Sequence, residues 1–246
     1  MTNDHFKGKE ALQHMVEVQT EGRLASVEIH GAETPGYLFA AMDALRETTL
    51  IILLISMILS YFEFISEQMY VLLFALGAAL VFWKMGRASW LAWSRLERLH
   101  RVMDEERHEI EQNRAQEKLE LKALYQAKGF QGKLLDDVVD VLMADGDRAL
   151  RVMLEEEMGF RLDQNEHPIL QGIGAGAGAL VATIFMLLAF ITQSVPLFIG
   201  VSLLLFAISC YITAKREHNK VIPAIVWNIS IALFATLVAY FTMQLQ

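Results

Sequence analysis

The chain has 246 residues, a formal net charge of −8 and 54% hydrophobic residues, with a positive mean hydropathy. The acidic balance argues against nucleic acid as a partner. A soluble domain carries about 45–50% apolar residues, and the excess here is concentrated in uncharged blocks, which favours a membrane protein. The single cysteine, Cys210, lies in one of these blocks, so we expect a small buried residue and no disulfide framework.

The uncharged blocks predict an all-α membrane protein with five transmembrane helices. The block from 168 to 214 is long enough for two spans. The first span has a shorter uncharged run and continues upstream past a single aspartate, Asp43. We expect the spans at about 37–63, 67–93, 168–192, 195–214 and 221–244.

Basic residues predict the orientation of these spans. Eleven lysines and arginines fall between 84 and 133, and three more lie in the loop 215–220. The connections 66–68 and 192–196 contain none. We therefore expect a cytoplasmic N-terminus and a C-terminus outside. Residues 1–36 lack the apolar core of a signal peptide, which favours a bacterial inner membrane.

The chain order predicts four parts: a cytoplasmic N-terminal segment (1–36), spans 1 and 2 (37–94), a cytoplasmic three-helix domain (95–166) and spans 3 to 5 (167–246). No glycine or proline interrupts residues 87–128, so we expect span 2 to continue as one helix to a C-cap at Gly129. A turn at 144–147 precedes a helix over 149–158, and Pro168 opens span 3. The glycines of 172–179 form small-xxx-small pairs that permit close helix packing.

Glutamates gather in the stretch "EERHEIEQNRAQEKLE" at 105–120. Glu106 and Glu109 are three residues apart, as are Glu117 and Glu120, and the two pairs are offset by 11 residues. On one continuous helix this offset returns to within about 20° of the start, so all four carboxylates would share one narrow stripe. The stripe has two interpretations, which are a solvated face that keeps the helix soluble and a row of ligands for a divalent metal.

Further candidate ligands lie on either side of this stretch. Met153 and Glu157 share a helix face at i,i+4, and a thioether beside carboxylates favours a transition metal. Asp43 lies within the expected first span, where an acidic residue is costly and indicates a functional site. Met85 lies at a comparable depth on span 2. An Asp–Met pair in a dimer would form a compact divalent-metal site.

These residues give the chain a resemblance to the vacuolar iron transporter family of iron and manganese transporters, from about Tyr37 to the C-terminus. The two Glu-x-x-Glu pairs, "LYQAKGF" and "VMLEEEMGF" resemble the family's cytoplasmic domain. "MDALRETTL" and "KMGRASWLAWS" resemble the ends of its first two spans. The chain departs from the family pattern at Arg46 and Lys84, and in the glycines of spans 1 and 2.

The resemblance implies a homodimeric transporter, not an enzyme, that exports Fe²⁺ or Mn²⁺ from the cytoplasm in exchange for protons. It implies a pathway at the two-fold interface, with metal ligands in the cytoplasmic domain (Glu106, Glu109, Glu117, Glu120, Met153 and Glu157) and in the membrane (Asp43 and Met85). Arg46 and Lys84 would repel a metal ion nearby. They favour an alternative, a membrane protein of the same fold that binds metal or has a structural role and does not transport.

A third hypothesis is a di-iron enzyme, since Glu105-x-x-His108 has the spacing found in ferritin-like sites. Such sites need a second Glu-x-x-His copy and two further glutamates on a four-helix bundle. The sequence contains one copy, so this hypothesis is the weakest of the three.

Overall fold

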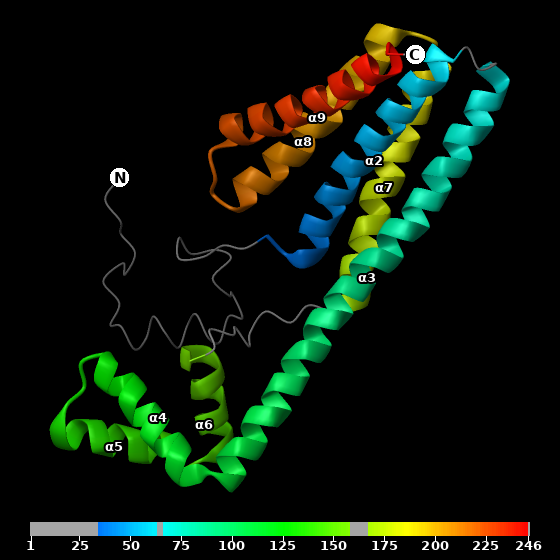
Figure 1. Cartoon of the computed structure of the whole chain (residues 1–246). Coiled ribbons are helices and arrows are strands. Elements are labelled where there is room, and N and C mark those ends of the chain that lie inside the picture. The colour runs from blue at the N-terminus through cyan, green and yellow to red at the C-terminus, as the bar shows by residue number, and fades with distance from the viewer. Residues whose placement is uncertain (1–33, 63–65, 158–166, 246) are drawn as a thin grey trace, which may run out of the picture. The chain divides into compact units, whose positions relative to one another are not determined.

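The computed structural model describes residues 34–62, 66–157 and 167–245, without the side chains of 66, 67, 156 and 157. Every regular element in these ranges is a helix (Figure 1). The chain divides into two compact units. Within the described ranges, the first holds α2, α7, α8, α9 and α3 as far as Trp90. The second begins at Leu91 and holds the rest of α3, α4, α5, α6 and the π-helix η1.

The first unit, called the membrane unit below, consists of α2 (Gly36–Tyr61), the first part of α3 (Ser66–Gln112), α7 (Pro168–Ile191), α8 (Val195–Arg216) and α9 (Val221–Met243). Among the described residues, four helices are long and apolar enough to cross a membrane: α3, α7, α8 and α9. The expected first span, α2, is not one of the four. Asp43, Arg46 and Glu47 occupy its first half, and its uncharged second half is shorter than the roughly 20 residues of a spanning helix.

The glycines of α7 allow two other helices to approach its backbone. A Cβ atom on Gly174 would lie 2.1 Å from the Tyr37 carbonyl oxygen, and one on Gly178 would lie 1.9 Å from the Ala41 carbonyl oxygen. Both oxygens belong to α2. The prediction that these glycines support close helix packing is confirmed.

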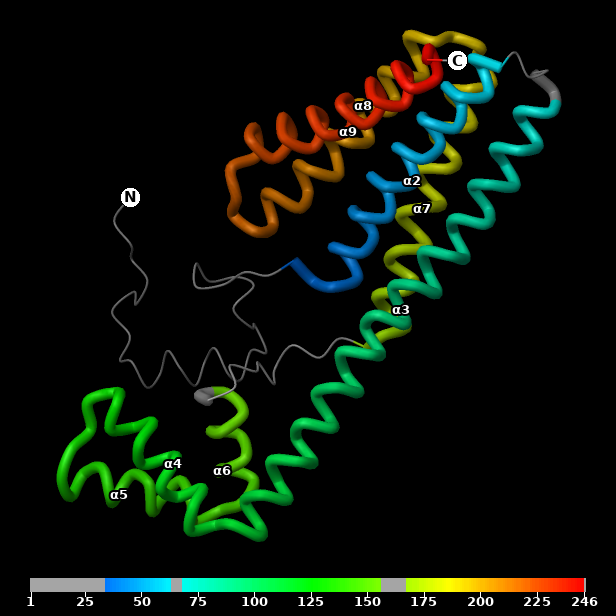
Figure 2. Tube along the Cα trace, viewed as in Figure 1, coloured from blue at the N-terminus to red at the C-terminus, as the bar shows by residue number. Residues whose placement is uncertain are grey.

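The alternate glycines of α7 face α3 instead. A Cβ atom on Gly172 would lie 1.9 Å from Ser89 Oγ, and one on Gly176 would lie 3.6 Å from Met85 Sδ. Two residues along a helix correspond to a rotation of about 200°, so the two glycine pairs lie on nearly opposite faces. Figures 1 and 2 show α7 between α2 and α3 accordingly.

Apolar side chains fill the space between the helices of the membrane unit. The buried cluster includes Leu45 and Ile52 of α2, Leu73 of α3, Met186 of α7 and Leu205 of α8. Cys210 is fully buried and forms no disulfide, as the sequence predicts. Pro168 is the first residue of α7, and the preceding His167 accepts a hydrogen bond from the Ile169 N–H.

The second unit, called the helical unit below, contains the end of α3, α4 (Arg114–Ala127), α5 (Gly132–Met143), α6 (Gly146–Val152) and η1 (Met153–Glu157). Its core combines Ile110 of α3 and Leu121 of α4 with buried residues of the later helices, which are Leu135, Val139, Met143, Ala149, Leu150, Met153 and Leu154. Gly129 has φ +99°, so the C-cap prediction at this glycine is confirmed.

The helix expected over 149–158 begins earlier, at Gly146. Asp145 is the reason, because its side chain accepts a hydrogen bond from the Arg148 N–H at 3.0 Å and caps the first turn. The expected end of this helix, at 158, lies outside the described residues. In place of a regular last turn, Met153–Glu157 form a π-helix.

The close contact between α2 and α7 leads to a stability prediction. Gly178→Ala should lower the melting temperature of the full chain in detergent, because its Cβ would overlap backbone atoms of α2 and overpacking costs about 1–3 kcal/mol. Gly200→Ala on α8 is the matched control, since its Cβ meets open space and alanine is the better helix former. Equal melting temperatures for the two variants would contradict this packing.

The cap of α6 leads to a second prediction. Asp145→Ala should lower the melting temperature of the helical unit at neutral pH. Asp145→Asn should keep most of the stabilisation by the cap, because asparagine is also a good N-cap residue. The hydrogen bond from the Arg148 N–H lowers the pKa of Asp145. Its stabilisation is therefore present above the ordinary pKa of about 4 and is lost as the pH falls through the lowered value.

Circular dichroism melts of the full chain across this pH range would show the effect. We expect wild type and Asp145→Asn to converge in acid. Asp137→Ala, which changes an exposed aspartate on α5, serves as a control for the loss of one negative charge. An Asp145→Ala melt identical to that of wild type at pH 7 would show that the cap is unimportant.

Candidate metal centre

The glutamate pairs lie on two helices rather than one. α3 ends at Gln112, and α4 begins at Arg114. The Asn113 N–H still donates to the Glu109 carbonyl at 2.7 Å, while the Asn113 carbonyl accepts from the Glu117 N–H at 3.1 Å. Figure 2 shows the chain changing direction at this point. The prediction of one continuous helix with a single stripe is therefore wrong.

The break changes what the glutamates can do. On a continuous helix, 11 residues span about 16 Å, whereas oxygen ligands lie about 2–2.6 Å from a divalent ion. A straight stripe could not close around one ion. With the break, Glu106 and Glu109 lie on α3 while Glu117 and Glu120 lie on α4, so carboxylates from two helices can approach a common point.

The four glutamates also differ in burial. Glu106 is 5% exposed and Glu117 is 4% exposed, whereas Glu109 and Glu120 are exposed. Glu106 lies one turn before Ile110, and Glu117 lies one turn before Leu121. Both of these apolar residues belong to the core of the helical unit. The first glutamate of each pair therefore lies on the helix face that packs into this core.

Met153 belongs to the same core and is 1% exposed. Core packing alone accounts for its burial. It is also the first residue of η1, and short π-helical turns are frequent at functional sites. Glu157 is the last residue of η1, and its side chain lies outside the described residues. Among the residues that are described, no three His, Cys, Asp or Glu side chains are grouped so that they could hold a metal ion.

Polar contacts between side chains fix the helices that carry these groups. Arg107 of α3 pairs with Asp147 of α6 at 3.1 Å. Two ion pairs join α4 to α5, Lys118–Asp140 and Lys122–Asp136. In addition, the Arg114 guanidinium donates to the Met143 carbonyl. Exposed ion pairs contribute little stability each, but together they hold α4 and α6 in register with the core.

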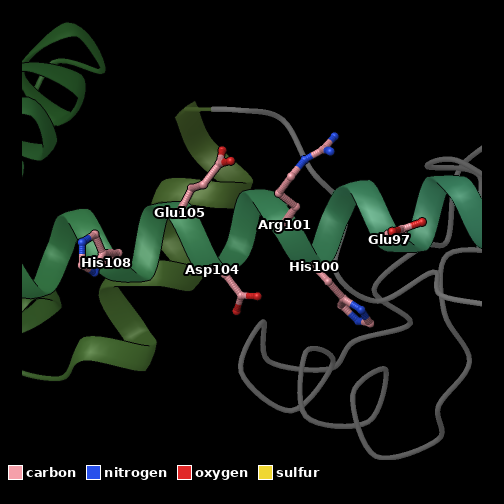
Figure 3. Close-up of a pocket in the computed structure, with 6 residues that line it drawn as sticks. All are labelled: Glu97, His100, Arg101, Asp104, Glu105 and His108. Atoms are coloured by element: carbon pink, nitrogen blue, oxygen red, sulfur yellow. The ribbon is translucent and has the colours of Figure 1, made fainter.

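A shallow hollow on α3 contains the residues of the di-iron hypothesis. Its lining consists of Glu97, His100, Arg101, Asp104, Glu105 and His108. In Figure 3, Arg101 and Glu105 point to one side of α3, and His100 and Asp104 point to the other. All of the lining residues belong to one helix, whereas a di-iron site draws its ligands from four.

In the membrane unit, the two candidate ligands contact different partners. Asp43 of α2 lies 3.6 Å from Arg46 in an i,i+3 ion pair, and its side chain is 44% exposed. Met85 of α3 packs against Gly176. Asp43 thus contacts a residue of its own helix, whereas Met85 contacts α7.

The basic residues expected to repel a metal are paired with carboxylates. Arg46 pairs with Asp43, and Lys84 of α3 pairs with Glu47 of α2. Sequence reasoning had not identified Glu47 as part of this group. The signal available for it was its i,i+4 spacing from Asp43, which puts both carboxylates on one helix face.

The model of the VIT family matches residues 84–244, about two thirds of the chain. The match includes Met85, the whole helical unit, α7, α8 and α9, and it begins after Asp43. No curated protein matches the chain. Together with its long apolar helices, this match shows that the chain is an integral membrane protein and belongs to the VIT family, the vacuolar iron transporter family.

Proposed function

We propose that this protein transports divalent iron or manganese and that its helical unit captures the metal first. The observation that carries the proposal is the burial of Glu106 and Glu117, one on each side of the break at Asn113, against the core that contains Met153. Exposed glutamates alone would suffice to keep a helix soluble. Two buried ones on two helices, in a unit whose core also contains a methionine, offer the ligand types of a first-row transition metal.

The remaining candidate ligands extend this site. Glu109 and Glu120 are exposed one turn from the buried pair and would attract cations from solution. Glu157 would approach from η1. Because carboxylates must be deprotonated to bind metal, capture weakens in acid, and release into a more acidic compartment follows from the same chemistry.

In the proposed transporter, α2 is the first of five spans, despite its charged first half. The basic residues that flank the other spans favour a cytoplasmic N-terminus, a cytoplasmic helical unit and a C-terminus outside. The pathway would lie between two copies of the chain, where Asp43 of one α2 and Met85 of one α3 replace part of the hydration shell of the ion. Proton entry would accompany metal export, and a bacterial inner membrane suits such a protein.

A second candidate function follows from the ion pairs of α2. Arg46 neutralises Asp43, and Lys84 neutralises Glu47. The carboxylates of the membrane unit are therefore already paired with basic side chains. This favours a membrane protein that binds metal in its helical unit and does not transport it.

Capture is tested by Mn²⁺ calorimetry on the full chain in detergent. Glu106→Gln and Glu117→Gln should each weaken Mn²⁺ binding at least tenfold, by comparison with the roughly 10–100-fold loss caused when a group supporting a metal ligand is removed. Glu111→Gln changes an exposed glutamate of α3 outside the candidate set and should bind as wild type does. If folded wild-type protein takes up no Mn²⁺, Co²⁺ or Fe²⁺, the capture proposal is wrong.

Transport is tested in liposomes that contain the full chain. Fe²⁺ or Mn²⁺ flux should depend on a pH gradient and should collapse in Asp43→Asn, because a neutral amide cannot compensate the charge of the ion in the membrane. Asp137→Ala in the helical unit is the control for a lost carboxylate. Metal binding without flux in folded wild-type protein would support the second candidate and exclude transport.

A further inference from the structure

Four charged side chains meet in the membrane unit where α2 approaches α3. Asp43, Arg46 and Glu47 lie on α2, and Lys84 lies on α3. Arg46 and Asp43 pair within one helix, whereas Lys84 and Glu47 pair between helices. The two carboxylates and the two cations have a formal net charge of zero.

Lys84 is the most buried member of this group. The residue is 8% exposed, while the side chains of Asp43 and Glu47 are each 44% exposed. A lysine is almost never buried to this degree unless it is paired. Lys84 makes its ion pair with Glu47, and it also lies within electrostatic reach of Asp43 and Arg87.

A divalent ion bound by Asp43 and Glu47 would raise the formal charge of this group from zero to +2 if both basic side chains stayed in place. Excess charge of this size is expensive at membrane depth. Binding therefore requires a basic side chain to leave. Arg46 is bound to its own helix and also lies 4.0 Å from the buried Cys210 sulfur, whereas Lys84 reaches across from another helix on a flexible four-carbon stem.

We propose that Lys84 is a tethered cation that occupies the carboxylates of α2 and competes with divalent metal for them. To bind in the membrane unit, a metal must then displace Lys84 from Glu47 and cannot rely on Asp43 alone. A role of Lys84 as a gate in the pathway rests on the proposed transport function. The competition between Lys84 and metal is a property of the ion pair, so it can be measured without measuring flux.

The test uses the full chain in nanodiscs, in a Glu106→Gln/Glu117→Gln background that removes the proposed capture ligands. Mn²⁺ binding is followed by electron paramagnetic resonance. Lys84→Gln in this background should bind one additional Mn²⁺ per chain, at least tenfold more tightly than the membrane unit with Lys84 intact. Lys84→Arg keeps the positive charge and should gain no site. Adding Glu47→Gln to Lys84→Gln should abolish the gained site.

Two results would overturn the proposal: folded Lys84→Gln protein without an additional Mn²⁺ site, or a gained site that survives Glu47→Gln. If Lys84→Gln does not fold, Lys84→Met is measured in its place. If neither folds while Lys84→Gln/Glu47→Gln does, the pair is structural and the proposal fails. Failure of capture would appear separately, as wild-type protein whose Mn²⁺ binding is unchanged by Glu106→Gln and Glu117→Gln.

Discussion

The change of direction at Asn113 is the constraint on which the candidate metal centre depends. It lets Ile110 of α3 and Leu121 of α4 enter one apolar core, and each brings a glutamate with it from the preceding turn. Without the break, the two glutamate pairs would lie one after the other along a single straight helix. The local geometry of one residue thus decides whether the acidic stretch is a row of separate charges or a set of converging ligands.

This break could not be predicted from the sequence. Asn113 stands among good helix formers, and its own helix propensity is only modestly below theirs. The break is stabilised by tertiary contacts, above all the core packing of Ile110 and Leu121 and the hydrogen bond from Arg114 to the Met143 carbonyl. These contacts join residues far apart in the chain, so local pattern reasoning has no access to them.

Other features were within reach of the sequence. The uncharged runs of α7, α8 and α9 predict their bounds closely, because a backbone in lipid must satisfy its hydrogen bonds within a helix. The glycine spacing of α7 predicts close packing, and the positive φ of Gly129 matches its expected role. The burial of Glu106 was also accessible, since Leu99, Met103, Glu106 and Ile110 follow a helical repeat. By contrast, no spacing rule pairs Glu47 with Lys84, which are brought together only by the helix packing.

The bare faces of α7 have a mechanical consequence. Where side chains interlock, neighbouring helices must separate before either can move. At Gly174 and Gly178, backbone of α2 rests on backbone of α7, whereas Gly172 and Gly176 receive the Ser89 and Met85 side chains of α3. Sliding of α2 along the axis of α7 therefore meets few side chains at Gly174 and Gly178. A rearrangement of α2 relative to α7 would therefore proceed by shear, while the side chains between α3 and α7 keep those two helices together.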